Sequence, residues 1–132
     1  MGLNIPQRKR VTMLVDIDPV AKPRMTRADK WKKRPCVLRY RQFADDLREA
    51  IAKANFVVGN QLYMEFHIPM PKSWSKKKKA ELIGSPHFQQ TPDTDNLCKA
   101  CLDALIEQDC RVWHLEAKKY WSEKGRIKIE NK

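Results

Sequence analysis

The segment Gln61–Ile68 constrains the fold most strongly, because apolar and polar residues alternate along its whole length. Alternation with a period of two predicts a β-strand whose two faces have different surroundings. Pro69 and Pro71 follow and mark the end of the strand, since proline cannot donate a ladder hydrogen bond. One face of this strand carries Leu62, Met64, Phe66 and Ile68, and we expect that face to be buried.

Further strands and helices are predicted on both sides of this segment. Strands are expected over Val11–Ile17, Val112–Trp121 and Gly125–Ile129, with Ser122–Gly125 joining the last two as a hairpin turn. Helices are expected over Tyr40–Ala54, over Lys76–Ile83 after an N-cap at Ser75, and over Asp95–Gln108. We therefore predict an α+β fold with about four strands and two or three helices. It forms a single domain over residues 1–132, with residues 1–10 as a flexible basic extension.

The positive charge is confined to one part of the chain. The formal net charge is +11, and residues 1–90 hold 19 basic and 8 acidic side chains, which already account for all of it. A strong excess of positive charge favours a polyanionic partner such as nucleic acid. No apolar stretch is long enough to span a membrane, and Met1–Arg10 has no apolar core of a secretory signal. We therefore expect a cytoplasmic protein whose four cysteines are reduced.

An acidic cluster lies inside this basic chain. The stretch Thr91–Asp109 contains five carboxylates and a single basic residue, Lys99. A cationic surface that holds phosphates beside carboxylates that hold metal ions is the arrangement of a nuclease. The alternative is that acidic and basic stretches are only solvated faces.

The predicted helix over Asp95–Gln108 places this chemistry on one face. Asp95, Lys99 and Asp103 are spaced at i, i+4 and i+8, so they share a face opposite the main apolar stripe. A second apolar stripe flanks the first, which suggests burial against the sheet and against something else, such as a partner subunit. The two stripes are Leu97, Ala100, Cys101, Ala104 and Leu105, and Cys98, Leu102 and Ile106.

Three aspartates could form a metal site. Asp93 and Asp95 are two residues apart, so in extended backbone their carboxylates face the same side, and a short return after the helix could bring Asp109 to them. Carboxylate oxygens suit Mg²⁺, which can polarise a phosphodiester, and Lys99 could stabilise the charge that develops on the phosphate. The alternative is that the aspartates are helix caps, and that Asp95 and Lys99 form a surface salt bridge.

The run PDTDNLCKACLDAL, followed by Asp109-x-x-Val112, closely resembles the signature of RusA-like Holliday junction endonucleases of bacteria, their phages and prophages. The segment Lys22-Pro23-Arg24 agrees with the same family. The resemblance implies a small α+β domain with a mixed sheet that works as a symmetric homodimer. It implies hydrolysis of branched DNA, chiefly the four-way junction, by paired nicks in recombination and repair. Mg²⁺ is the implied cofactor, with Mn²⁺ as a substitute.

The resemblance also assigns residues. Asp93, Asp95 and Asp109 take the positions of the metal-binding aspartates, Lys99 takes that of the catalytic lysine, and Asn96 and Asp103 are supporting residues. The connection Ile106–Gln108 is shorter than in many members, so Asp109 is the candidate for the third ligand unless Glu107 substitutes.

Two basic segments are expected to bind DNA phosphates. Their residues are Lys22, Arg24, Arg27, Lys30, Lys32, Lys33 and Arg34 in the first, and Lys76 and Lys77 in the second. Trp31 or Trp74 could stack on exposed bases or could only cover the core. The chain has no glycine-rich phosphate loop, so no nucleotide cofactor is expected. The competing hypothesis is a non-catalytic nucleic-acid-binding module whose aspartates are only helix caps and salt-bridge partners.

Overall fold

The computed structural model describes residues 12–24, 34–87, 89–106 and 111–132. These residues form a four-stranded sheet and three helices, which confirms the α+β prediction. The strands are β1 (Thr12–Val15), β2 (Gln61–Pro69), β3 (His114–Ser122) and β4 (Arg126–Asn131). The helices are α1 (Pro35–Ala54), α2 (Lys76–Leu82) and α3 (Thr94–Leu105).

The strand order is β1-β4-β2-β3, and the sheet is mixed. Strand β2 pairs in parallel with β3, whereas β4 pairs antiparallel with both β1 and β2. The alternation predicted for β2 is confirmed, because its four apolar side chains are buried and its polar side chains are half-buried. The buried face of the sheet is completed by Ile127 and Ile129 of β4 and by Met13 and Val15 of β1.

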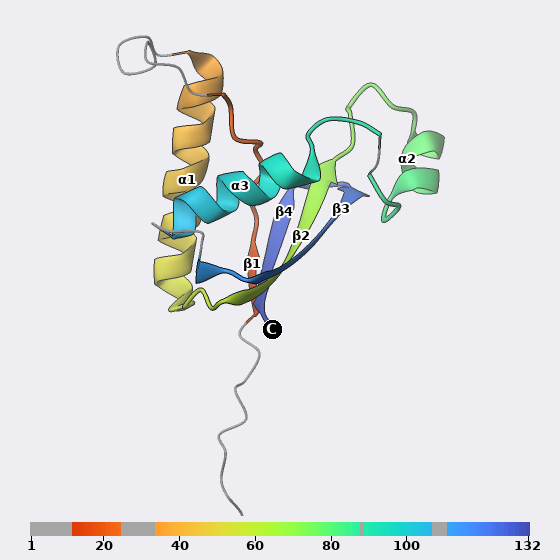
Figure 1. Ribbon diagram of the computed structural model, residues 1–132. Helices are drawn as coiled ribbons and strands as arrows, with labels where there is room; N and C mark the ends of the chain where they lie inside the picture. Colours follow the sequence, from red (N-terminus) through yellow and green to blue (C-terminus); the bar gives the residue numbers. More distant parts are fainter. Residues whose placement is uncertain (1–11, 25–33, 88, 107–110) are drawn as a thin grey trace, which may run out of the picture.

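Helices α1 and α3 pack on this apolar face (Figure 1). Helix α1 buries Val37, Tyr40, Phe43, Ala44 and Leu47, which recur at helical spacing. Helix α3 lies across the sheet and also contacts α1, so most of both its apolar stripes are buried inside one chain. The second stripe therefore needs no partner subunit to cover it. The Nε atom of Arg48 in α1 also donates to the carbonyl oxygen of Ala104 at the end of α3, at 2.7 Å.

The predicted hairpin between β3 and β4 is wrong. Strand β2 lies between them, so the short turn after Ser122 crosses the end of β2 instead of joining two paired strands. The N–H of Met70 donates to the carbonyl of Ser122 at 2.9 Å, which holds this turn to the chain leaving β2. The short connection between β3 and β4 suggested that these two strands pair with each other. Instead, β2 with its apolar face occupies the interior of the sheet and pairs with one of them on each side.

Several element boundaries also differ from the predictions. Helix α1 begins at Pro35, where proline suits the first helical position, and ends at Ala54, after which the C-cap Asn55 lies in the left-handed region with a φ of 52°. Helix α3 ends at Leu105 and not at Gln108, because Ile106 already has extended backbone. The Ser75 N-cap is confirmed, since its hydroxyl accepts the N–H of Lys78 at 3.2 Å. Within the described residues, none of the helices combines the length and the apolar character needed to cross a bilayer.

Candidate functional site

The acidic cluster lies at the beginning of α3. Asp93 is the N-cap residue, with φ −71° and ψ 142°, and its carbonyl accepts the N–H of Leu97 at 3.1 Å. Asp95 lies in the first turn, so the two aspartates are not both in extended backbone as the sequence suggested. Both side chains are exposed. The positive end of the helix macrodipole stabilises negative charge at this place.

Among the described residues, no side chain hydrogen-bonds or ion-pairs with either carboxylate. The side chain of Asp93 makes no capping hydrogen bond, although the residue occupies the N-cap. Asp95 and Lys99 do not form the i, i+4 salt bridge of the alternative hypothesis, and no described residue gives either aspartate an ion pair or a side-chain hydrogen bond. The described part of the chain thus gives these carboxylates no structural partner, and their oxygens can accept a ligand.

A cationic cavity lies beside them. It has a volume of about 460 Å³ and is lined by Lys22, Pro23, Arg24, Asn96 and Lys99. The fold therefore brings the Lys22-Pro23-Arg24 segment to the exposed face of α3, where the N–H of Lys22 reaches the carbonyl of Asn96 at 3.4 Å. The Arg34 guanidinium donates to the carbonyl of Arg24 at 2.8 Å and supports the same segment.

Asp103 of α3 makes a second contact with the Lys22-Pro23-Arg24 segment. Its carboxylate forms an ion pair with the ammonium group of Lys22, and both side chains are about three-quarters buried, at 27% and 26% exposure. Asp103, predicted as a supporting residue, thus holds this segment against α3. The ion pair also balances part of the positive charge of Lys22 within the protein.

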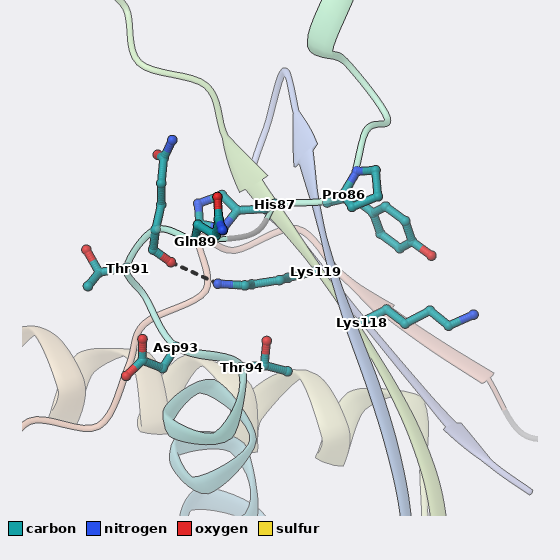
Figure 2. A pocket seen from close by; sticks show the side chains of 10 residues that line it. Pro86, His87, Gln89, Thr91, Asp93, Thr94, Lys118 and Lys119 are labelled. Atoms are coloured by element: carbon teal, nitrogen blue, oxygen red, sulfur yellow. Dashed lines mark hydrogen bonds between the residues drawn. The ribbon is translucent and has the colours of Figure 1, made fainter.

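A second cavity, of about 670 Å³, also reaches the α3 N-terminus (Figure 2). Asp93 and Thr94 form one wall, and residues of the preceding loop and of β3 form the others. The Nζ atom of Lys119 donates to the carbonyl oxygens of Gln90, at 2.9 Å, and of Pro92, at 2.8 Å. The sequence analysis did not single out Lys119, although its place in the apolar phase of the predicted strand was a usable signal.

His87 forms the buried end of this cavity. It is 2% exposed, its ring lies 4.2 Å from that of Trp121, and its Nδ1 atom has no hydrogen-bond partner among the described residues. Burial, with the nearby charge of Lys119, holds the pKa of His87 below its usual value, so the ring is neutral at pH 7.

Other predicted residues are placed differently or fall outside the described ranges. Lys76 and Lys77 are exposed on α2, which projects from the sheet on the side where α3 begins (Figure 1). Trp74 packs against Trp121 at 4.7 Å and under the ammonium group of Lys78 at 4.2 Å, which favours a covering role. The structure does not describe Asp109, Glu107, Arg27, Trp31, Lys30, Lys32 or Lys33.

The donor set around Asp93 suits a hard divalent cation. Mg²⁺ is usually held by one or two carboxylates, with water and substrate phosphate oxygens in the remaining positions. Asp93 and Asp95, two carboxylates at the N-cap and in the first turn of α3, supply that number of carboxylates. The described residues contain no group of three His, Cys, Asp or Glu side chains that could hold a metal, so a third protein ligand would have to come from outside them. Cys98 and Cys101 are buried free thiols of the core.

Comparison with known proteins identifies the family. The family described as Endodeoxyribonuclease RusA matches residues 16–131, which begin just after β1 and include β2, β3, β4 and all three helices. No curated protein matches the chain. The match contains Asp93, Asp95 and Lys99 in the arrangement described above. The chain therefore belongs to the RusA family, a family of nucleases that act on branched DNA and are generally dependent on divalent metal ions.

Proposed function

We propose that this protein is a Mg²⁺-dependent endonuclease that resolves four-way DNA junctions by paired nicks, in the cytoplasm of a bacterium and from a host or phage gene. The observation that carries the proposal is the pair of unengaged carboxylates, Asp93 and Asp95, at the start of α3 with Lys99 exposed on the next turn. No described residue gives these three side chains a hydrogen bond or an ion pair, whereas metal-dependent phosphodiester hydrolysis uses all three.

Each residue has a proposed role. Asp93 and Asp95 hold Mg²⁺ together with Asp109, or with Glu107 in its place. Mg²⁺ bound there supplies polarisation of the scissile phosphate and activation of a water molecule. Lys99 lines the cationic cavity and stabilises the charge that develops on the phosphate in the transition state. Asn96 lines the same cavity and orients the phosphate.

The DNA path follows the cationic cavity. Arg24 and Lys99 contact the phosphates nearest the scissile bond, and Lys22 contributes to the same field while it anchors its segment to Asp103. The basic residues of 25–34, with Lys76 and Lys77 of α2, extend the phosphate contacts along the DNA arms. Such contacts give affinity and position without reading base sequence.

A homodimer accounts for paired nicking. A four-way junction with two-fold symmetry presents two equivalent phosphates, and a two-fold symmetric dimer presents two equivalent sites. Each site then cuts one of the two opposing strands.

The test is cleavage of a synthetic four-way junction whose strands are labelled one at a time. With Mg²⁺ or Mn²⁺ we expect nicks in two opposing strands, giving two nicked duplexes, and with EDTA we expect none. A linear duplex of the same arm sequence is the control, and it should remain uncut. Tight junction binding without nicking in either metal would contradict the proposal and favour the non-catalytic binding module.

A further inference from the structure

Lys119 occupies an unusual place in the sheet. It is in register with Phe66 of β2, and its neighbours on the same face of β3 are Ala117 and Trp121. This is the face that α3 and α1 cover, so a lysine here stands where the alternation calls for an apolar residue. The side chain is half-buried at the cavity, and the protein offers hydrogen-bond acceptors to its ammonium group there.

The acceptors are two carbonyls of the loop that leads into α3. Lys119 Nζ lies 2.9 Å from the oxygen of Gln90 and 2.8 Å from that of Pro92, and Figure 2 shows the side chain reaching across the cavity to this loop. The carbonyl of Pro92 belongs to the peptide unit that continues into Asp93. The ammonium group therefore fixes the backbone immediately before the first metal-binding aspartate.

The same strand holds the earlier part of the loop. The carbonyl of Lys119 accepts the N–H of His87 at 3.0 Å, and the N–H of Trp121 donates to the carbonyl of Ser85 at 2.9 Å. Backbone pairing between this loop and β3 thus ends near His87. Farther along the loop, the Lys119 side chain connects β3 to the carbonyl oxygens of Gln90 and Pro92. Proline at position 92 has no N–H with which to anchor itself.

The direction of the Asp93 carboxylate depends on this backbone. Its side chain makes no capping hydrogen bond that would hold it by itself. We infer that Lys119 is a positioning residue that fixes the Gln90–Pro92 loop, and through it the Asp93 carboxylate, for divalent metal binding. The inference rests on the proposed function, because it takes Asp93 to be a metal ligand.

A different explanation of Lys119 needs to be separated from this one. Strand β3 is at the edge of the four-stranded sheet, although residues 84–87 already pair with its backbone near Lys119, and an inward-pointing charge on an edge strand can prevent pairing with another chain. That role predicts self-association when the charge is lost, with no change in metal affinity. Positioning predicts the reverse.

The test uses three variants of the full chain. Lys119→Met keeps the length of the side chain and removes both hydrogen bonds, and Lys119→Arg restores a cation that can donate to two carbonyls. Lys128→Met is the matched control, since Lys128 is a strand lysine in register with Glu65, on the opposite face of the sheet. Circular dichroism and size-exclusion chromatography establish that each variant is folded and report its self-association.

The decisive readout is Mn²⁺ binding measured by electron paramagnetic resonance without DNA. We expect Lys119→Met to bind Mn²⁺ at least about tenfold more weakly, as when a group that orients a metal ligand is lost, and Lys119→Arg to recover most of the affinity. Lys128→Met should match the wild type. In junction cleavage, raising the Mg²⁺ concentration should restore much of the activity of Lys119→Met.

The outcomes separate the two proposals. If the wild type binds Mn²⁺ and nicks junctions while Lys119→Met binds Mn²⁺ equally well, the positioning role is overturned and the proposed function stands. Self-association of Lys119→Met with unchanged Mn²⁺ affinity overturns it in favour of edge protection. If the wild type neither binds Mn²⁺ nor nicks junctions, both proposals fail together.

Discussion

The ammonium group of Lys22, just after β1, forms an ion pair with the carboxylate of Asp103 in α3, across 81 positions of sequence. This pair lies at the edge of the cationic cavity that contains Arg24 and Lys99. It ties the segment that follows β1 to the helix that carries the acidic cluster. The same ion pair therefore contributes to the stability of the fold and to the geometry of the candidate site.

A double-mutant cycle on Lys22→Met and Asp103→Asn should show this coupling. Because both side chains are about three-quarters buried, we expect an interaction free energy of about 1 kcal/mol from urea unfolding. The exposed Glu49–Lys53 pair of α1 is the control and should couple by about 0.3–0.5 kcal/mol. Equal coupling in the two cycles would show that burial adds nothing to the Lys22–Asp103 pair, and zero coupling would show that the two side chains do not pair in solution.

Loss of the Arg48 contact should destabilise the helix pair. Its guanidinium satisfies the carbonyl of Ala104 in the last turn of α3, where backbone acceptors lack partners within the helix. We expect Arg48→Ala to lower the free energy of unfolding by about 1 kcal/mol. Arg39→Ala, an exposed arginine on the same helix, should change it by less than about 0.5 kcal/mol. The hydrogen bond is unimportant if the two variants are equally stable.

Gly125 should tolerate no side chain. A Cβ atom built there would lie 2.6 Å from the Cα atom of Asp18, so backbone would have to move. We expect Gly125→Ala to cost about 1–3 kcal/mol of stability in thermal and urea unfolding. At Gly84, nothing lies within 4 Å of such an atom, and Gly84→Ala should cost about 1 kcal/mol through its φ of +79° alone. A larger loss at Gly84 than at Gly125 would contradict the packing of the β3–β4 turn.

The thiols should react according to burial. Burial raises the pKa of Cys98 to about 11 and raises the pKa of Cys101 well above its ordinary value. A raised pKa means that the thiolate, which is the reactive form, is scarce at pH 8 and increases only as the pH rises toward the pKa. Iodoacetamide at pH 8 should therefore modify exposed Cys36 and spare Cys98 and Cys101, as peptide mass spectrometry can measure.

Unfolded protein is the control for this labelling. In urea at the same pH, Cys36, Cys98 and Cys101 should react at similar rates. Rapid labelling of Cys101 in the native protein would show that α3 opens readily, contrary to its burial between the sheet and α1.

The sequence was sufficient for the parts of the fold that follow local periodicity. The alternation in Gln61–Ile68 identified β2, and helical spacing identified α1 and α3, because one buried face imposes its period on the chain. Pairing of strands is a different matter. The β3–β4 hairpin was predicted from closeness in sequence, and β2 lies between these strands because both its edges find partners in the mixed sheet.

The candidate site was predictable in composition but not in its contacts. The spacing of Asp93, Asp95 and Lys99 identified the acidic motif, and Lys22-Pro23-Arg24 was associated with it. The ion pair of Lys22 with Asp103 and the contact of Lys119 with the Gln90–Pro92 loop both depend on tertiary packing. Local sequence carries no signal for the partner in either contact, and the third carboxylate remains a prediction.

The most direct test of the account compares Asp95→Asn with wild type on a labelled four-way junction. Asparagine keeps the size and helix position of the side chain and removes the charge that would hold Mg²⁺. We expect junction nicking to fall by at least about 10³-fold, on the scale of losing a major electrostatic contribution to catalysis. Junction binding in EDTA should persist, and the free energy of unfolding should fall by no more than about 1 kcal/mol through the lost interaction with the helix macrodipole. Asp46→Asn, an aspartate of α1 hydrogen-bonded to Gln42, is the control and should nick normally. Full nicking activity in Asp95→Asn would contradict the assignment of the active site to the start of α3.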